Sequence, residues 1–103
     1  MNIAKMMQAA ATAQKKMAKI QEELAQRTLE ATSGGGRVTV TASGTGEILS
    51  LKIAPEVVSA DDVEMLEDLI LSAVRQAMAD AKKLSEAEMG KLTAGLGMPG
   101  LPF

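Results

Sequence analysis

Two stretches of the chain place an apolar residue every three or four positions, which is the spacing of one face of an α-helix. The first covers Ile3–Gln26 and repeats over about three heptads, as in helices that pack in a coiled-coil manner. No Gly or Pro occurs before Gly34, so one uninterrupted helix is predicted. The residues of this N-terminal stripe are Ile3, Met6, Ala10, Ala13, Met17, Ile20 and Leu24, while Met7 lies off it.

The second helical stretch follows a connector and begins at Ser59 or Asp61. Asp61 with Glu64 three residues later fits a variant of the capping box, and acids crowd the first turns, where the helix dipole favours negative charge. The helix is predicted to run to about Leu92, with Gly95 ending it. Its apolar positions are Val63, Leu66, Leu69, Ile70, Ala73, Val74, Ala77, Met78, Ala81 and Leu84.

Three short segments between these helices alternate apolar and polar residues with the period of two that is typical of β-strands. They are Thr28–Thr32, Arg37–Ser43 and Ile48–Ile53, and glycine-containing turns at 33–36 and 44–46 separate them. Ala54-Pro55 ends the third strand. The inward positions are predicted as Leu29, Ala31, Val38, Val40 and Ala42, with Leu49, Leu51 and Ile53 sharing a face of the third strand, and the outward ones as Thr39, Thr41 and Ser43.

The predicted fold is therefore α+β: a long N-terminal helix, a three-stranded antiparallel meander and a long C-terminal helix. Residues 1–94 form a single domain, and residues 95–103 form a Gly/Pro-rich tail that is expected to be poorly ordered in isolation. The tail is apolar at Met98, Leu101 and Phe103, where a protein partner could bind. Short strands with open edges favour pairing with a second copy, so a homodimer is expected.

Composition excludes several kinds of chemistry. There is no His and no Cys, and no serine has an evident base in a recognisable motif, so the chain is not predicted to be an enzyme. The acids Asp61, Asp62, Glu64 and Asp68 are interpreted as helix-capping residues, although they could in principle hold a hard cation. The glycines at 34–36 lack the Lys-Ser/Thr of a phosphate loop and are interpreted as a hairpin turn. No cofactor, metal or small-molecule substrate is predicted.

The sequence contains neither a signal peptide nor an apolar run of the roughly 18 residues that a membrane span needs, so no membrane partner is expected. The net charge is −2 and the pI about 5.1, so an interface with nucleic acid would depend on local clustering of bases. Such clustering exists, because the first acid of the chain is Glu22. The candidate basic residues are Lys5, Lys15, Lys16 and Lys19 on the first helix, and Lys82 and Lys83 on the second.

Other interpretations of these lysines remain open. The first group could form an ordinary solvated helix face, and Lys82 and Lys83 could complement the helix dipole.

The order of features resembles the YbaB/EbfC family of nucleoid-associated proteins. The chain has a Met/Gln/Lys/Ala-rich opening helix, M-M-Q-A-A-A-T-A-Q-K-K-M-A-K-I-Q-E-E-L-A, and a hairpin, G-G-G-R-V-T-V-T-A-S-G-T-G-E-I. The third strand with its proline, L-S-L-K-I-A-P-E-V-V, then precedes the acidic helix start D-D-V-E-M-L-E-D-L-I and the ending G-M-P-G-L-P-F. The resemblance spans essentially the whole chain.

This resemblance implies a bacterial protein of the cytoplasm and nucleoid, shaped like tweezers: a homodimer joined through its sheets, with helix pairs as arms. It also implies binding to double-stranded DNA through basic residues of the arms, which in this chain are Lys15, Lys16, Lys19, Lys82 and Lys83, with Lys5 and Lys91 near the arm ends. Phosphate contact with weak sequence preference is the predicted mechanism. The competing interpretation is a protein-interaction module that uses the N-terminal stripe or the tail and does not bind DNA.

Overall fold

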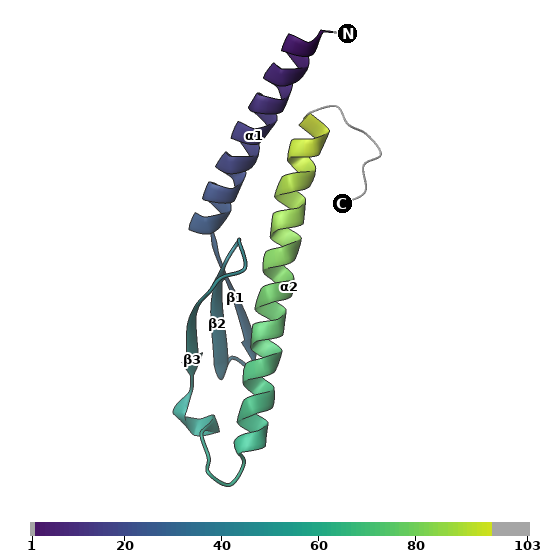
Figure 1. The fold of residues 1–103 in the computed structure, drawn as a ribbon. Helices are drawn as coiled ribbons and strands as arrows, with labels where there is room; N and C mark the ends of the chain where they lie inside the picture. Colours follow the sequence, from purple (N-terminus) through teal and green to yellow (C-terminus); the bar gives the residue numbers. More distant parts are fainter. Residues whose placement is uncertain (1, 96–103) are drawn as a thin grey trace.

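The computed structural model describes residues 2–95, which form an elongated molecule with principal extents of 70 × 24 × 16 Å. The predicted α+β order of helix, three-stranded meander and helix is confirmed (Figure 1). The tail at 96–103, with Met98, Leu101 and Phe103, lies outside the described residues. The elements are α1 (Ile3–Gln26), β1 (Thr28–Ser33), β2 (Val38–Ser43), β3 (Ile48–Ile53), the short 3-10 helix η1 (Pro55–Val57) and α2 (Val63–Gly95).

The three strands form an antiparallel sheet in the order β1-β2-β3, and α2 lies along one face of it (Figure 1). Val38, Val40 and Ala42 of β2 point toward α2 and are completely buried. Ala31 of β1 pairs with Val40 and joins the same core, as predicted. The helix contributes a stripe of small residues to this core, namely Ala73 and Ala77, and continues it toward the arm with Ala81.

The outward position predicted for Ser43 was wrong. Ser43 is buried, not outward, because the residues that follow it fold back beside it: its Oγ contacts Thr45 Oγ1 at 2.7 Å and accepts a hydrogen bond from the Glu47 N–H. β3 has the predicted bounds, and Leu51 and Ile53 share a face as predicted, since they pair with Val40 and Val38, but Leu49 falls at an irregularity of the register. In β3, Leu49 and Leu51 remain 49% and 44% exposed. The reason is that α2 packs on β1 and β2 and leaves β3 uncovered.

The regular alternation predicted for β3 is also interrupted. Thr41 pairs with Ser50, but the next residue, Ala42, pairs with Ile48, so β3 contains an extra residue at this point. Such a bulge moves the residues on either side of it to a different register. Ile48, rather than Leu49, is therefore opposite the inward-facing Ala42.

The predicted start of the second helix was wrong by two to four residues. The helix begins at Val63, because the Asp62 carboxylate accepts a hydrogen bond from the Met65 N–H at 3.1 Å and caps the helix. Asp61 lies in the preceding turn, where its N–H donates to Ser59 Oγ, so the predicted Asp61–Glu64 capping box does not form. At the other end, α2 passes through Gly90 and is helical to Gly95, three residues beyond the predicted Leu92.

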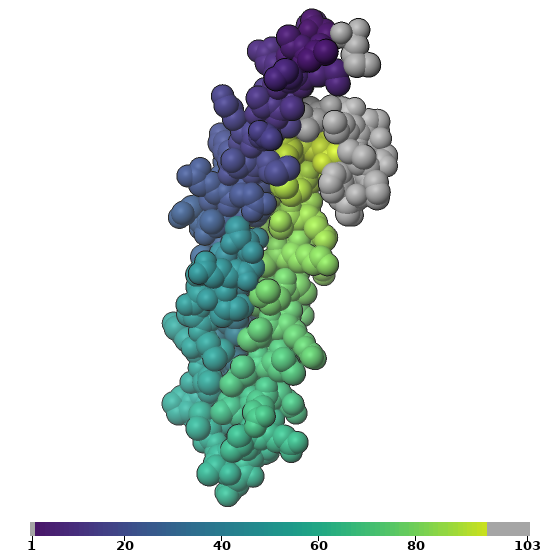
Figure 2. Space-filling view, viewed as in Figure 1, coloured from purple at the N-terminus to yellow at the C-terminus, as the bar shows by residue number. Residues whose placement is uncertain are grey.

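Beyond the sheet, α1 and the last part of α2 run side by side in opposite directions (Figure 1). We call this projection, α1 together with residues 82–95 of α2, the arm. Leu24 of the N-terminal stripe is buried at the base of the arm, and Ile20 is half-buried further out. The N-terminal part of α1 projects beyond the end of α2 (Figure 2).

Gly44 in the β2–β3 turn fixes the base of the arm. Its N–H donates to the carbonyl oxygens of Leu24 and Arg27, both at 3.0 Å, so the turn binds carbonyl groups at the end of α1. A Cβ at this position would lie 2.8 Å from the Leu24 carbonyl oxygen and 3.2 Å from a methyl carbon of Leu84. Glycine is required here because the backbones of α1 and the turn come too close for any side chain.

We expect Gly44→Ala to lower the free energy of unfolding by about 1–3 kcal/mol, the usual cost of forcing an extra methyl group into a packed site. Gly90→Ala is the matched control. A Cβ at Gly90 meets nothing within 4 Å, and alanine in a helix is more favourable than glycine by about 0.5–1 kcal/mol, so this variant should be more stable. Urea denaturation measures both, and equal effects of the two substitutions would contradict the close approach at Gly44.

Candidate nucleic-acid interface

All six candidate lysines lie on the arm, and Lys5 is at its outer end, where α1 extends past α2. Their side chains are exposed, and within residues 2–95 none of the six forms an ion pair. They are therefore free to meet a ligand without breaking an existing interaction. The six are Lys5, Lys15, Lys16 and Lys19 on α1, and Lys82 and Lys83 on α2.

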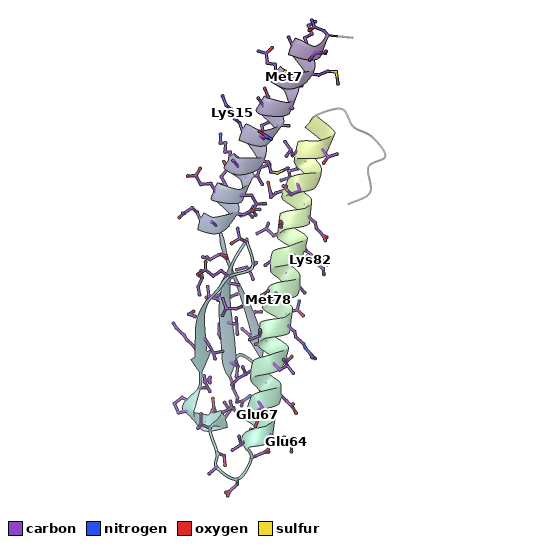
Figure 3. All side chains as sticks on the ribbon, viewed as in Figure 1. Met7, Lys15, Glu64, Glu67, Met78 and Lys82 are labelled. Atoms are coloured by element: carbon purple, nitrogen blue, oxygen red, sulfur yellow. The ribbon has the colours of Figure 1, made fainter. Side chains whose placement is uncertain are left out.

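The structure brings these lysines to one end of the molecule but not to one face. At 100° per residue, Lys15 and Lys19 lie on the side of α1 opposite the N-terminal stripe, which faces α2 at the arm base. Lys82 is similarly opposite the alanine stripe of α2. Lys15 and Lys82 accordingly occupy opposite flanks of the arm (Figure 3). Each arm thus presents two separate basic strips, with the α1 strip carrying more lysines.

Lys91 differs from the other lysines. Its Nζ lies 3.2 Å from Glu88 Oε1, and the same oxygen lies 3.3 Å from an Arg27 guanidinium nitrogen. Glu88 therefore joins the end of α1 to α2 and occupies both bases. Sequence reasoning missed this cluster, because Arg27 and Glu88 are 61 residues apart and no local pattern links them.

Charge is segregated along the molecule. The arm, with Arg27 at its base, carries eight basic side chains and four acidic ones, whereas residues 55–68, at the opposite end, carry six acids and no base. Glu64 and Glu67 mark this acidic end in Figure 3, far from Lys15. The remaining segments are neutral, so the net charge of −2 conceals an arm of about +4 and a distal end of about −6.

The surface offers no converging set of catalytic groups in its described part. A hollow of about 660 Å³ at the arm base is lined by Lys19, Glu22, Glu23, Gln26 and Arg27, a mixture of both charges. Among residues 2–95, no three acids are close enough to hold a metal ion, and the acids at the start of α2 include the helix cap Asp62. None of the helices described is both long and apolar enough to cross a membrane.

Comparison with known proteins places this arrangement in a family. Residues 1–96 match the YbaB/EbfC DNA-binding family. The chain belongs to this family. A nucleoid-associated protein of Thermoanaerobacter pseudethanolicus is 50% identical to the chain over 100 residues, which cover 97% of this chain and 90% of that protein. A nucleoid-associated protein of Clostridium novyi is 52% identical over 101 residues, covering 98% and 89% of the two chains.

The family fold is also found at low sequence identity. The crystal structure of an uncharacterized protein from Helicobacter pylori superposes with a TM-score of 0.82 at 20% identity, over 89% of this chain and 97% of that one. This likeness supports the arrangement of two helices around a three-stranded sheet and carries no information about ligands.

Proposed function

We propose that this member of the YbaB/EbfC family is a nucleoid-associated protein that binds double-stranded DNA in the bacterial cytoplasm, as a binding protein rather than an enzyme. The observation that carries the proposal is the charge segregation: every candidate lysine is on the arm, whereas residues 55–68 at the far end carry six acids, of which only Glu56 forms an ion pair in the described structure, with Arg37 at 3.6 Å. A polyanion approaching the molecule is attracted to the arm and repelled from the distal end. The uneven distribution of charge therefore orients the protein on DNA, and the net negative charge of the whole molecule does not prevent binding.

The lysines contact phosphates. Each ammonium group that neutralises a phosphate releases condensed counterions, so affinity depends on how many phosphates are neutralised and not on the net charge of the whole protein. Lysine is a point charge on a flexible stem and does not impose the bidentate geometry by which arginine reads guanine. Weak sequence preference follows from this set of residues.

We expect the double variant Lys15→Glu/Lys19→Glu to weaken binding and to reduce the slope of log affinity against log salt by about one for each phosphate that is no longer neutralised. The measurement is fluorescence anisotropy of a labelled random-sequence duplex at about 50 and 200 mM salt. Arg75→Glu is the control, because Arg75 is exposed on the side of α2 opposite the alanine stripe, outside the arm and away from β3. Unchanged affinity and slope in the double variant would remove the α1 lysines from the site.

The second basic strip should contribute less. Lys82 and Lys83 both lie one turn from Glu86 on the same helix, which lowers the positive potential around them. On α1 only Lys19 has acids one turn away, Glu22 and Glu23, and the other three lysines have none. We therefore expect Lys82→Glu/Lys83→Glu to weaken binding less than the α1 double variant in the same titration. A larger effect of the α2 pair would mean that DNA contacts the other flank of the arm.

We further propose that two copies join through β3 to form a tweezer-like homodimer. β3 is an edge strand that leaves Ile48, Leu49 and Leu51 more than 40% exposed, and Met78 of α2 is similarly exposed beside the adjoining β2–β3 turn. An open strand edge next to an apolar surface is a site at which another chain can pair. Dimerisation would place two basic arms on one DNA-binding unit.

We expect Leu51→Glu to convert the protein to monomers, as measured by light scattering coupled to size-exclusion chromatography. Ser50→Glu is the matched control, because Ser50 is the exposed neighbour of Leu51 and belongs to the other face of the sheet. Its side chain is away from the apolar surface, so this variant should remain dimeric. A wild-type protein that elutes as a monomer, or a dimeric Leu51→Glu variant, would contradict the proposed interface.

A second candidate function is a protein-interaction module, which the exposed apolar residues at the outer end of α1 favour. Salt separates the two functions: binding to phosphates weakens steeply as salt rises, whereas apolar docking does not. The anisotropy titration therefore distinguishes them without further variants.

A further inference from the structure

The outer end of the N-terminal stripe has no cover among the described residues. Ile3 is 70% exposed and Met6 55% exposed, and Met7 beside them is 68% exposed. The same stripe is half-buried at Ile20 and buried at Leu24, where α2 and the β2–β3 turn pack on it. Because α1 extends past the end of α2 (Figure 1), the stripe continues along α1 beyond the part that α2 covers.

The part of the chain outside the described residues has the composition to cover this surface. The eight residues that follow Gly95 are L-G-M-P-G-L-P-F, with four large apolar side chains and no charged one. Phe103 is the only aromatic residue in the protein. We infer that residues 96–103 pack on the outer end of the N-terminal stripe of the same chain and complete the arm.

The chain connection makes this packing geometrically accessible. Gly95 is on the arm, on the helix that runs beside α1 and ends short of its N-terminus (Figure 1). Eight residues extend up to about 26–29 Å, whereas α1 from Ala13 back to Ile3 is only about 15 Å long. Because the segment is tethered, its effective concentration at α1 is in the millimolar range, far above that of a separate chain.

Pro99 and Pro102 suit an apolar docking site. Neither has an N–H group, so two fewer backbone donors must give up their hydrogen bonds to water when the segment lies on α1. Proline also restricts the free segment and lowers the entropic cost of docking.

This packing leaves two of the proposed DNA contacts, Lys15 and Lys19, uncovered. Lys15 and Lys19 are on the opposite side of α1 from the stripe, so an uncharged segment on the stripe neither covers nor neutralises them. The inference therefore stands independently of DNA binding and is tested without it.

Phe103→Trp tests the inference directly, because the chain contains no other Trp and no Tyr. If the segment docks, tryptophan emission lies at shorter wavelength than in a free peptide of residues 96–103 with the same substitution. Adding Met6→Glu should return the emission to the peptide value, because a charge then occupies the docking surface. Gln8→Glu is the matched control: Gln8 is exposed on the opposite side of α1, and this variant should keep the short-wavelength emission.

Emission equal to that of the free peptide in the Phe103→Trp protein would overturn the inference. A short-wavelength emission that disappears on dilution would also overturn it, because the segment would then be held by another copy of the chain.

A second measurement does not depend on a new side chain. Truncation after Gly95 should shift the methyl NMR signals of Met6 and Met7, whose cover is removed, and leave that of Met65 at the far end of the molecule unchanged. Unchanged Met6 and Met7 signals would show that the segment does not contact α1.

Discussion

The close approach of α2 to the sheet is the interaction on which the rest of the structure depends. Ala73, Ala77 and Ala81 recur every four residues and are at most 2% exposed. Ala73 and Ala77 share a core with the valines of β2, so the helix backbone lies close to that strand, and Ala81 continues the stripe toward the arm. The protein has a single aromatic residue, so few bulky side chains are available for the core. Small side chains on both the sheet and α2 allow the two to pack closely. α2 covers β1 and β2 and leaves β3 exposed. Beyond the sheet, the same helix continues as half of the arm (Figure 1).

Local patterns were sufficient to predict the elements of this fold, because each element has its own period. The β2 alternation predicted Val38, Val40 and Ala42 in the core. The apolar stripe predicted for the second helix contains the buried Ala73, Ala77 and Ala81, but also Val63 and Met78, which are 51% and 43% exposed. The failures have both local and distant causes: the start of α2 depends on whether Asp61 or Asp62 caps the helix, and the exposure of β3 depends on where α2 packs. The alternation of β2 puts Ser43 on the outward face, but Ser43 is buried beside Thr45 and Glu47. The alternation of β3 is interrupted by a bulge that no residue type in the strand signals.

In the candidate site, the sequence predicted which residues are basic and exposed, but not how the two helices of the arm place them relative to one another. The lysines of α1 stand out in the sequence because no acid interrupts them, and the structure finds them exposed. Their separation from Lys82 by the width of the arm depends on how two helices pack, which the sequence does not specify residue by residue. The Glu88 cluster that occupies Lys91 and Arg27 likewise exists only once the arm has formed. The charge segregation follows from chain order, since acids at the start of α2 fold to the end opposite α1.

The backbone hydrogen bonds at Gly44 have a mechanical consequence. α1 is fixed near its C-terminal end, where the turn binds Leu24 and Arg27, and its outer turns are largely exposed in the described structure. With 24 residues, the helix is about 36 Å long, so a rotation of about 5° at the base displaces the tip by about 3 Å. A rotation of α1 would therefore take place about the residues that the β2–β3 turn binds, Leu24 and Arg27. In the proposed dimer the displacements of two such arms would add, so the backbone contacts at Gly44 would set the distance between the two tips.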